Sequence, residues 1–149
     1  MMKTTMHVQA TRGTGLNFAI DTGSGHSMLL DTADLEPGKS AGPCPTELLL
    51  AALAGCTGMA ITPILQKMKQ DIESYTIQVS GEKTTRPPYI FHTITVEHHF
   101  SGPGIDEDVV QRALELVEKK YCSVGAMLNA DVKVTHSIHI HRTDFTSNV

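Results

Sequence analysis

Cys56 and Cys122 are the residues of this chain with the most open chemistry, and Cys44 is the one further cysteine. A thiolate is a nucleophile, a metal ligand and a target for oxidation, whereas a buried neutral thiol behaves as a small apolar side chain. If Cys56 and Cys122 meet in space, a peroxide would oxidise one to a sulfenic acid, and the other would condense with it to a disulfide. The alternative is two unrelated buried thiols, and their spacing does not decide between the two.

The histidines are the second candidates for chemistry, because eight of them are present and six fall on the two predicted strands 89–100 and 132–141, among them His98, His99 and His136. His139 and His141 share one face of a strand, as two metal ligands would. Histidines on a wet strand face are more often simply solvated, and no Cys-x-x-Cys or His-Glu-x-x-His spacing is present. The sequence therefore predicts neither a metal site nor a cofactor. Ser-His-Asp catalysis is not supported either, because no Gly-x-Ser-x-Gly turn occurs.

Cys56 lies in a segment that must form a deeply buried helix. Residues 48–56, LLLAALAGC, contain no polar side chain, so we expect this helix to be buried on every face. Pro45 suits the first helical position, and Glu47 puts negative charge in the first turn. Pro63 removes one helical hydrogen bond and predicts a kink one turn beyond Cys56. The sequence thus brings a thiol to the middle of the protein.

The other elements follow from periodicity and turn residues. Three short strands are expected before the central helix, then two antiparallel strands, a helix with Asp106 as its N-cap, a short helix capped by Ser123, and a last strand. The predicted ranges are 6–11, 16–21, 26–31, 74–80, 89–100, 107–121, 124–128 and 132–141, with a loop over 34–42 and Ile90, Ile94, Val96 and Phe100 on one strand face. This order indicates the α+β class and one domain over residues 1–149.

Composition excludes several classes of protein. The net charge of −4 and the scattered basic residues give no stripe that would bind nucleic acid. No export signal and no apolar run of about 20 residues is visible, which predicts a cytoplasmic protein without a membrane span. A helix that is apolar all round needs more cover than one small sheet supplies, so we expect a homodimer.

Cys122 is predicted to lie just before the start of the short helix capped by Ser123. Aligned amides at that helix start would stabilise a thiolate, and Lys119 and Lys120 add positive charge nearby.

The cysteine motifs resemble those of a known family. Gly42-Pro43-Cys44-Pro45-Thr46-Glu47-Leu48-Leu49, then Ala52-Leu53-Ala54-Gly55-Cys56, and later Tyr121-Cys122-Ser123-Val124, are similar to the OsmC/Ohr family of osmotically inducible and organic hydroperoxide resistance proteins. The resemblance implies an intertwined α+β homodimer, with antiparallel sheets wrapped around long central helices and active sites at the subunit interface. It also implies that Cys56 attacks an organic hydroperoxide, that Cys122 closes a disulfide, and that a dithiol such as a lipoylated protein reduces this disulfide.

Two departures concern the groups that activate the thiol. Family peroxidases usually have Asn-Pro-Glu where this chain has Cys44-Pro45-Thr46-Glu47, and one residue turns a side chain by about 100° on a helix. Glu47 is either a substitute for that carboxylate or a first-turn acid. The family's arginine has one counterpart here, Arg12, whose match needs a one-residue gap. Cys44 is open to two interpretations, a weak cap or a third redox thiol.

These observations predict a thiol-dependent peroxidase with Cys56, Cys122, Glu47 and Arg12 as its catalytic residues. Two alternatives remain: a non-catalytic dimer that binds a small apolar or thiol ligand, and a redox sensor.

Overall fold

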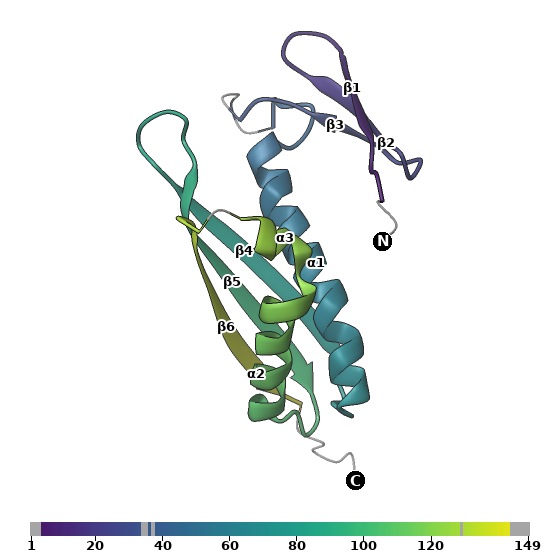
Figure 1. The fold of residues 1–149 in the computed structure, drawn as a ribbon, viewed down its shortest axis with the longest axis vertical. Coiled ribbons are helices and arrows are strands. Elements are labelled where there is room, and N and C mark those ends of the chain that lie inside the picture. Colours follow the sequence, from purple (N-terminus) through teal and green to yellow (C-terminus); the bar gives the residue numbers. More distant parts are fainter. Residues whose placement is uncertain (1–3, 34–35, 37, 129, 144–149) are drawn as a thin grey trace. The chain divides into compact units, whose positions relative to one another are not determined.

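The computed structural model describes residues 4–33, 36, 38–128 and 130–143, and the chain forms two compact units, Met1–Leu49 and Leu50–Val149 (Figure 1). The boundary falls within helix α1, Pro45–Lys67. Two three-stranded sheets and several helices confirm the predicted α+β class. The interpretation of residues 1–149 as a single domain stays a prediction.

The N-terminal unit contains the predicted meander, an antiparallel sheet of β1 (Val8–Arg12), β2 (Phe18–Thr22) and β3 (Ser27–Leu30). The Asp31 carboxylate connects the end of β3 to Ala41, because it accepts hydrogen bonds from the amides of Thr32 and Ala41 at 2.8 and 2.9 Å. These two bonds lower the pKa of the Asp31 carboxyl. Of the predicted loop 34–42, residues 34, 35 and 37 lie outside the described residues.

Helix α1 begins at Pro45, as predicted, and Cys44 caps it. The carbonyl of Cys44 accepts hydrogen bonds from the amides of Glu47 and Leu48 at 3.0 and 3.3 Å. The Glu47 carboxylate reaches back to the amide of Cys44 at 2.8 Å, which is the second half of a capping box. Glu47 is thus a first-turn acid that bonds the start of the helix. Its further role at the thiol, and the choice between the two interpretations of Cys44, stay predictions.

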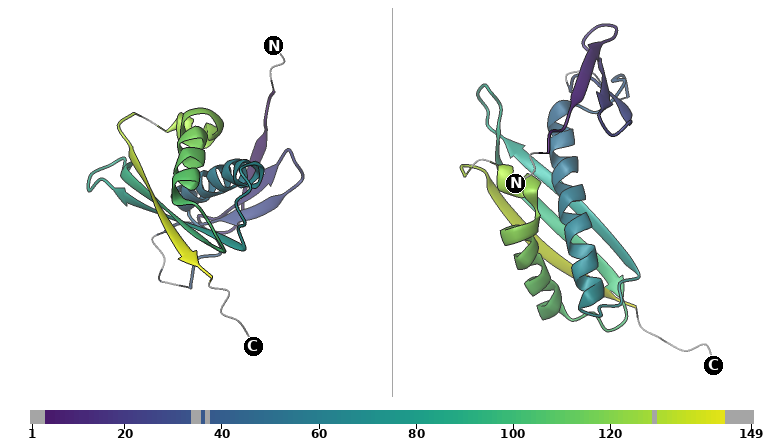
Figure 2. Two further views of the ribbon diagram at one scale, coloured as in Figure 1. Left: turned by 90° about the horizontal axis from the view of Figure 1, so that it is seen from below. Right: turned by 45° about the vertical axis from the view of Figure 1, so that its right-hand side comes forward.

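The C-terminal unit is a sheet with all its helices on one face (Figures 1 and 2). Its strands are β4 (Ser74–Lys83), β5 (Phe91–Gly102) and β6 (Lys133–Arg142), in that order. The β4–β5 pair is antiparallel, as predicted, but the β5–β6 pair is parallel, so this sheet is mixed and not antiparallel throughout as the family resemblance implies. The helical layer consists of α1 from Leu50 onward, α2 (Glu107–Leu116), the π-helical turn η1 (Val117–Tyr121) and α3 (Ser123–Met127).

The helix predicted over 107–121 is not continuous. It starts at the predicted N-cap, where the Asp106 carboxylate accepts hydrogen bonds from the amides of Asp108 and Val109. At η1 the helix widens, because the amide of Cys122 bonds the carbonyl of Val117, five residues back, at 2.9 Å. This turn ends at Cys122, one residue before α3.

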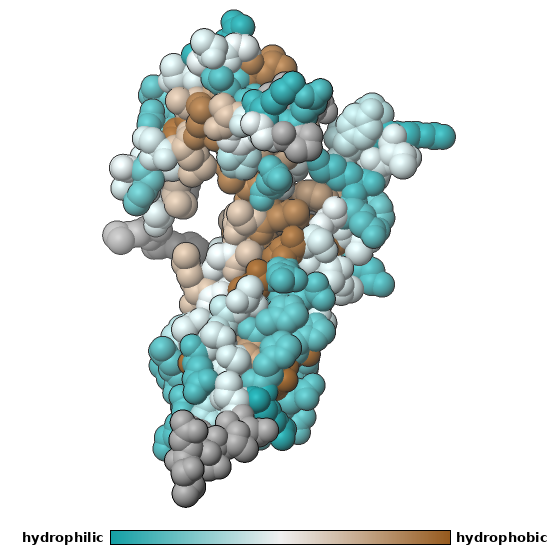
Figure 3. Space-filling view, turned by 180° about the vertical axis from the view of Figure 1, so that it is seen from behind, coloured by the Kyte–Doolittle hydropathy of each residue, from teal (hydrophilic) through white to brown (hydrophobic). Residues whose placement is uncertain are grey.

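The expectation that α1 is buried on every face is wrong for the single chain. Its buried side chains form one stripe at four-residue spacing, Leu53, Thr57, Ile61 and Leu65. One sheet covers one side of a helix, so other side chains stay open to solvent, and Met59 is 80% exposed. Apolar surface of this kind appears brown in Figure 3. Whether α1 bends at Pro63 stays a prediction.

The sequence predicts no apolar segment of membrane-spanning length, but helix α1 is one by length and composition. By length and composition alone it could cross a membrane, but the core helix of a globular protein passes the same test. Here its buried stripe joins a core that contains Ile94, Val96 and Phe100 of β5. Ile90 does not share that face: the β4–β5 register shifts between Glu82 and Lys83, so Phe91 is buried and Ile90 is half exposed.

A chain of hydrogen-bonded polar side chains crosses the buried face of the sheet. Tyr75 Oη is 2.7 Å from His98 Nδ1, and His98 Nε2 is 2.9 Å from His136 Nδ1. His136 Nε2 lies 3.3 Å from a carboxylate oxygen of Glu118 on η1. Two neutral rings satisfy every bond if Tyr75 donates to His98, His98 to His136, and His136 to Glu118; this tautomer assignment follows from the network.

His98 is fully buried in this chain and stays uncharged. Burial, with smaller contributions from His136 and His99, lowers the pKa of His98 to about 4. Burial also raises the pKa of Tyr75, so the phenol keeps its proton. We call Tyr75, His98, His136 and Glu118 the buried polar chain; its Glu118 end reaches solvent, with 42% of that side chain exposed.

Replacement of Tyr75 by Phe tests this chain. Tyr75→Phe removes the partner of a buried ring nitrogen, and we expect a loss of about 1–3 kcal/mol in the free energy of unfolding. Urea unfolding followed by circular dichroism measures it. Tyr89→Phe is the matched control, because Tyr89 is 54% exposed. Equal stability of Tyr75→Phe and the control would contradict the hydrogen-bonded assignment.

The cap of α1 is tested at Glu47. Glu47→Ala removes the acceptor for the Cys44 amide, and we expect a loss of about 0.5–2 kcal/mol in the free energy of unfolding. Glu47→Gln keeps a side-chain oxygen at the same reach and should lose less. If both variants unfold like the wild type, the carboxylate does not hold the start of the helix.

Candidate active site

The structure brings the two predicted redox cysteines together in the C-terminal unit. Cys56 lies on α1 and Cys122 lies between η1 and α3. Cys56 Sγ is 3.8 Å from the hydroxyl of Ser123, and the hydroxyl of Thr57 is 3.6 Å from Cys122 Sγ. Neighbouring residues of α1 thus contact neighbouring residues at the start of α3. All three cysteines of the chain are free thiols.

The surroundings of Cys56 favour its thiolate. Partial burial raises the pKa of Cys56, but hydrogen bonds outweigh it: the amides of Val124 and Ser123, the Cys122 thiol and the Ser123 hydroxyl all lower it. The pKa of Cys56 therefore lies below that of an ordinary thiol. Within this unit, the groups that lower the pKa of Cys56 are backbone amides, the Cys122 thiol and the Ser123 hydroxyl.

Cys122 has the opposite tendency, and the expectation of a thiolate there is wrong. Burial raises the pKa of Cys122, and the charge that forms on Cys56 raises it further, against the bonds from Thr57 and the Gly125 amide. The helix cap is displaced by one residue from the prediction. Cys122, not Ser123, is the N-cap of α3, and its sulfur accepts from Gly125 N at 3.3 Å. The amides of Ser123 and Val124 donate to Cys56 instead.

An apolar groove of about 480 Å³ opens beside Cys56. It is lined by Cys56, Met59, Ala60, Pro63, Ile64, Lys67 and Tyr121. The carbon-rich lining suits an apolar substrate, and the Lys67 ammonium supplies a positive charge. The half-buried sulfur of Cys56 therefore faces a space of ligand size, which a thiol enclosed in the core would not.

A smaller cavity of about 110 Å³ lies next to Cys122. Cys122, Thr57, Glu118 and His136 are among its lining residues, so the buried polar chain ends at the same cavity as the second thiol. A space of this size with several polar groups suits ordered water. The arrangement can pass a proton between the neighbourhood of Cys122 and Glu118.

The buried polar chain is not among the features predicted from the sequence, although the sequence carries a signal for it. His98 alternates with Val96 and Phe100 in a period of two, which puts a polar ring on the core face of β5. A buried polar residue needs a partner, and this requirement points to further polar groups on neighbouring strands.

Arg12 and Glu47 belong to the N-terminal unit. Arg12 is the last residue of β1, and its Nε donates to the carbonyl of Gly15 at 3.3 Å. Glu47 caps α1, as described above. Their role at the sulfur of Cys56 stays a prediction.

Comparisons with known proteins agree with the cysteine motifs. The family model described as OsmC-like protein matches residues 37–137. Protein YhfA of Escherichia coli strain K12 is 34% identical over 126 residues, which cover 85% of this chain and 91% of that protein.

Solved structures show the same fold at lower identity. An OsmC-like protein from Mycoplasma pneumoniae is 16% identical, with a TM-score of 0.77 over 96% of this chain and 100% of that chain. A protein from Legionella pneumophila described as organic hydroperoxide resistance protein OsmC is 20% identical, with a TM-score of 0.66 over 93% and 99% of the two chains. The chain therefore belongs to the OsmC-like family.

Proposed function

We propose that this protein is a thiol-dependent peroxidase that reduces organic hydroperoxides to alcohols. The observation that carries the proposal is the setting of Cys56, whose sulfur faces an apolar groove and is stabilised as a thiolate by amides and a second thiol. Membership of the OsmC-like family and the fold shared with a protein described as an organic hydroperoxide resistance protein support it.

In the first step the Cys56 thiolate attacks the outer oxygen of the hydroperoxide. The O–O bond breaks, Cys56 becomes a sulfenic acid, and the alkoxide takes up a proton and leaves as the alcohol. The apolar groove holds the organic group, while the Ser123 hydroxyl, 3.8 Å from Cys56 Sγ, is a neighbouring polar group for the reacting oxygens.

In the second step Cys122 attacks the sulfur of Cys56. An S–S bond forms, and the hydroxyl of the sulfenic acid leaves with the thiol proton of Cys122 as water. The cavity shared by Cys122, His136 and Glu118 gives this proton and water a polar route. A dithiol reductant, such as a lipoylated protein, then reduces the disulfide and restores both thiols.

The proposal includes a homodimer with active sites at its interface in the cytoplasm. The open apolar side of α1, with Met59 at 80% exposure, supports a partner subunit. Arg12 and Glu47 are proposed as further activating groups, although each also has the local hydrogen bond described above.

A second candidate is a non-catalytic dimer that holds a small apolar or thiol ligand, and the groove beside Cys56 favours it. A redox sensor is the third. Both differ from a peroxidase in turnover: the binder holds a ligand without consuming peroxide, and the sensor forms one disulfide per chain and stops.

Peroxide consumption separates these candidates. With cumene hydroperoxide and dihydrolipoamide we expect sustained turnover by the wild type and a loss of at least about 100-fold in Cys56→Ser, because the nucleophile is removed. Cys122→Ser should accumulate a sulfenic acid that dimedone traps. Cys44→Ser is the control and should keep wild-type turnover. Equal turnover in wild type and Cys56→Ser would end the peroxidase proposal.

The order of thiol reactivity is a separate expectation. Because hydrogen bonds lower the pKa of Cys56 and burial raises that of Cys122, iodoacetamide at neutral pH should modify Cys56 first. Peptide mass spectrometry after limited alkylation measures both rates, and the rate at Cys56 should rise to its plateau at a lower pH. Faster alkylation of Cys122 than of Cys56 would contradict this order and would show that the amides at the start of α3 do not stabilise the Cys56 thiolate.

A further inference from the structure

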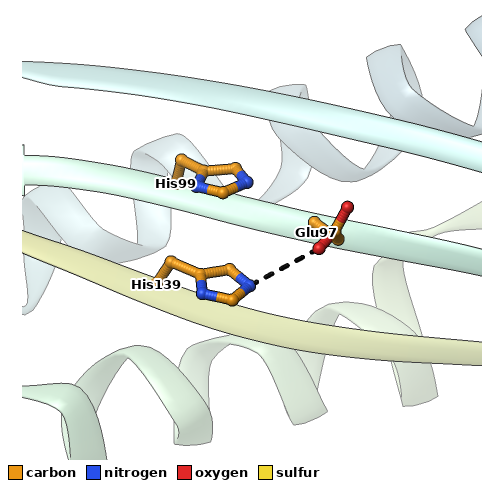
Figure 4. A group of neighbouring side chains, drawn as sticks. All are labelled: Glu97, His99 and His139. Carbon is orange, nitrogen blue, oxygen red and sulfur yellow. Dashed lines mark ion pairs between the residues drawn. The ribbon is translucent and has the colours of Figure 1, made fainter.

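A second cluster of ionisable side chains lies on the face of the β4–β5–β6 sheet that the helices leave uncovered. It consists of Glu97, His99 and His139, whose ligand atoms all lie within 4.8 Å of one another (Figure 4). Glu97 and His99 are two residues apart on β5 and so share a face, and the parallel register places His139 of β6 beside His99.

One nitrogen of this cluster is buried without a partner. His99 Nε2 has no hydrogen bond in the part of the chain that the structure describes. A buried polar atom in this condition costs free energy, and such atoms are rare in folded proteins. His98, the neighbouring residue on the opposite face, has both ring nitrogens bonded. In Figure 4 the His99 and His139 rings both point toward the Glu97 carboxylate.

The cluster needs only a small adjustment to surround an ion. His139 Nε2 is 3.7 Å from Glu97 Oε1, close to the roughly 3.3 Å between two ligands of one tetrahedral zinc ion. The rings of His99 and His139 are stacked at 4.6 Å and 11°, so one ring must turn before both lone pairs meet at a single point. The His139 side chain is 43% exposed on a strand at the edge of the β4–β5–β6 order. Its Nε2 lies 3.2 Å from the Ser137 hydroxyl, and binding an ion would replace this contact.

We propose that Glu97, His99 and His139 form a binding site for a divalent transition metal, with Zn²⁺ the best match. Two imidazole nitrogens and one carboxylate oxygen are ligands that Zn²⁺ favours, and the fourth position is left for water or for His141. The His141 ring stacks on His99 at 5.9 Å and lies on the same face. The ion would satisfy His99 Nε2 and tie β5 to β6.

Zinc binding is measured by titration calorimetry on protein freed of metal with a chelator. The background is the full chain with Cys44→Ser, Cys56→Ser and Cys122→Ser, because thiols also bind zinc. We expect one Zn²⁺ per chain, and a loss of affinity of at least about 100-fold in Glu97→Gln and in His139→Gln. Co²⁺ should give the absorption of a tetrahedral site, lost in the same variants.

Matched controls keep the assignment falsifiable. His92→Gln replaces an exposed histidine of β5 that bonds Thr93 and lies outside the cluster, and it should bind zinc like the background protein. Zinc should also raise the unfolding temperature of the background protein and of His92→Gln, but not of His139→Gln. Absent binding, or equal binding in the background protein and His139→Gln, would overturn the proposal.

Discussion

The packing of α1 against the end of η1 is the contact on which the candidate site depends. The buried Thr57 of α1 meets Cys122, and one residue away Cys56 meets Ser123. This pairing requires the wide turn that ends at Cys122, because a shift of one residue on a helix rotates a side chain by about 100°. The same contact directs the amides of Ser123 and Val124 at Cys56. It therefore places the two thiols side by side and lowers the pKa of Cys56 relative to that of Cys122.

The sheet separates two chemistries through its period of two. On β5, His98 faces the helices and joins the buried polar chain, whereas His99 faces the other way and joins Glu97 and His139. The neighbouring strand repeats the division, with His136 on one face and His139 on the other. Consecutive histidines that look alike in the sequence therefore belong to two sites: one ends beside Cys122, and the other is our proposed metal site.

Much of the fold follows from local sequence, and the finer points of the site do not. Pro45, Asp106 and the alternating strands set the element order, because caps and periodicity act within a few residues. The amide assignment depends on Cys122 rather than Ser123 being the cap, a difference of one residue that propensity cannot resolve. The single buried stripe of α1 and the inward His98 depend on which element covers which face, and that is a tertiary property.

The central claim is that Cys56 reacts with a hydroperoxide and Cys122 closes the disulfide. Its most direct test is one equivalent of cumene hydroperoxide added to the reduced full-length protein, followed by disulfide mapping with mass spectrometry. We expect one disulfide, between Cys56 and Cys122, formed together with one equivalent of cumyl alcohol, while Cys44 stays a free thiol. Three unreacted thiols, or a disulfide that includes Cys44, would contradict it.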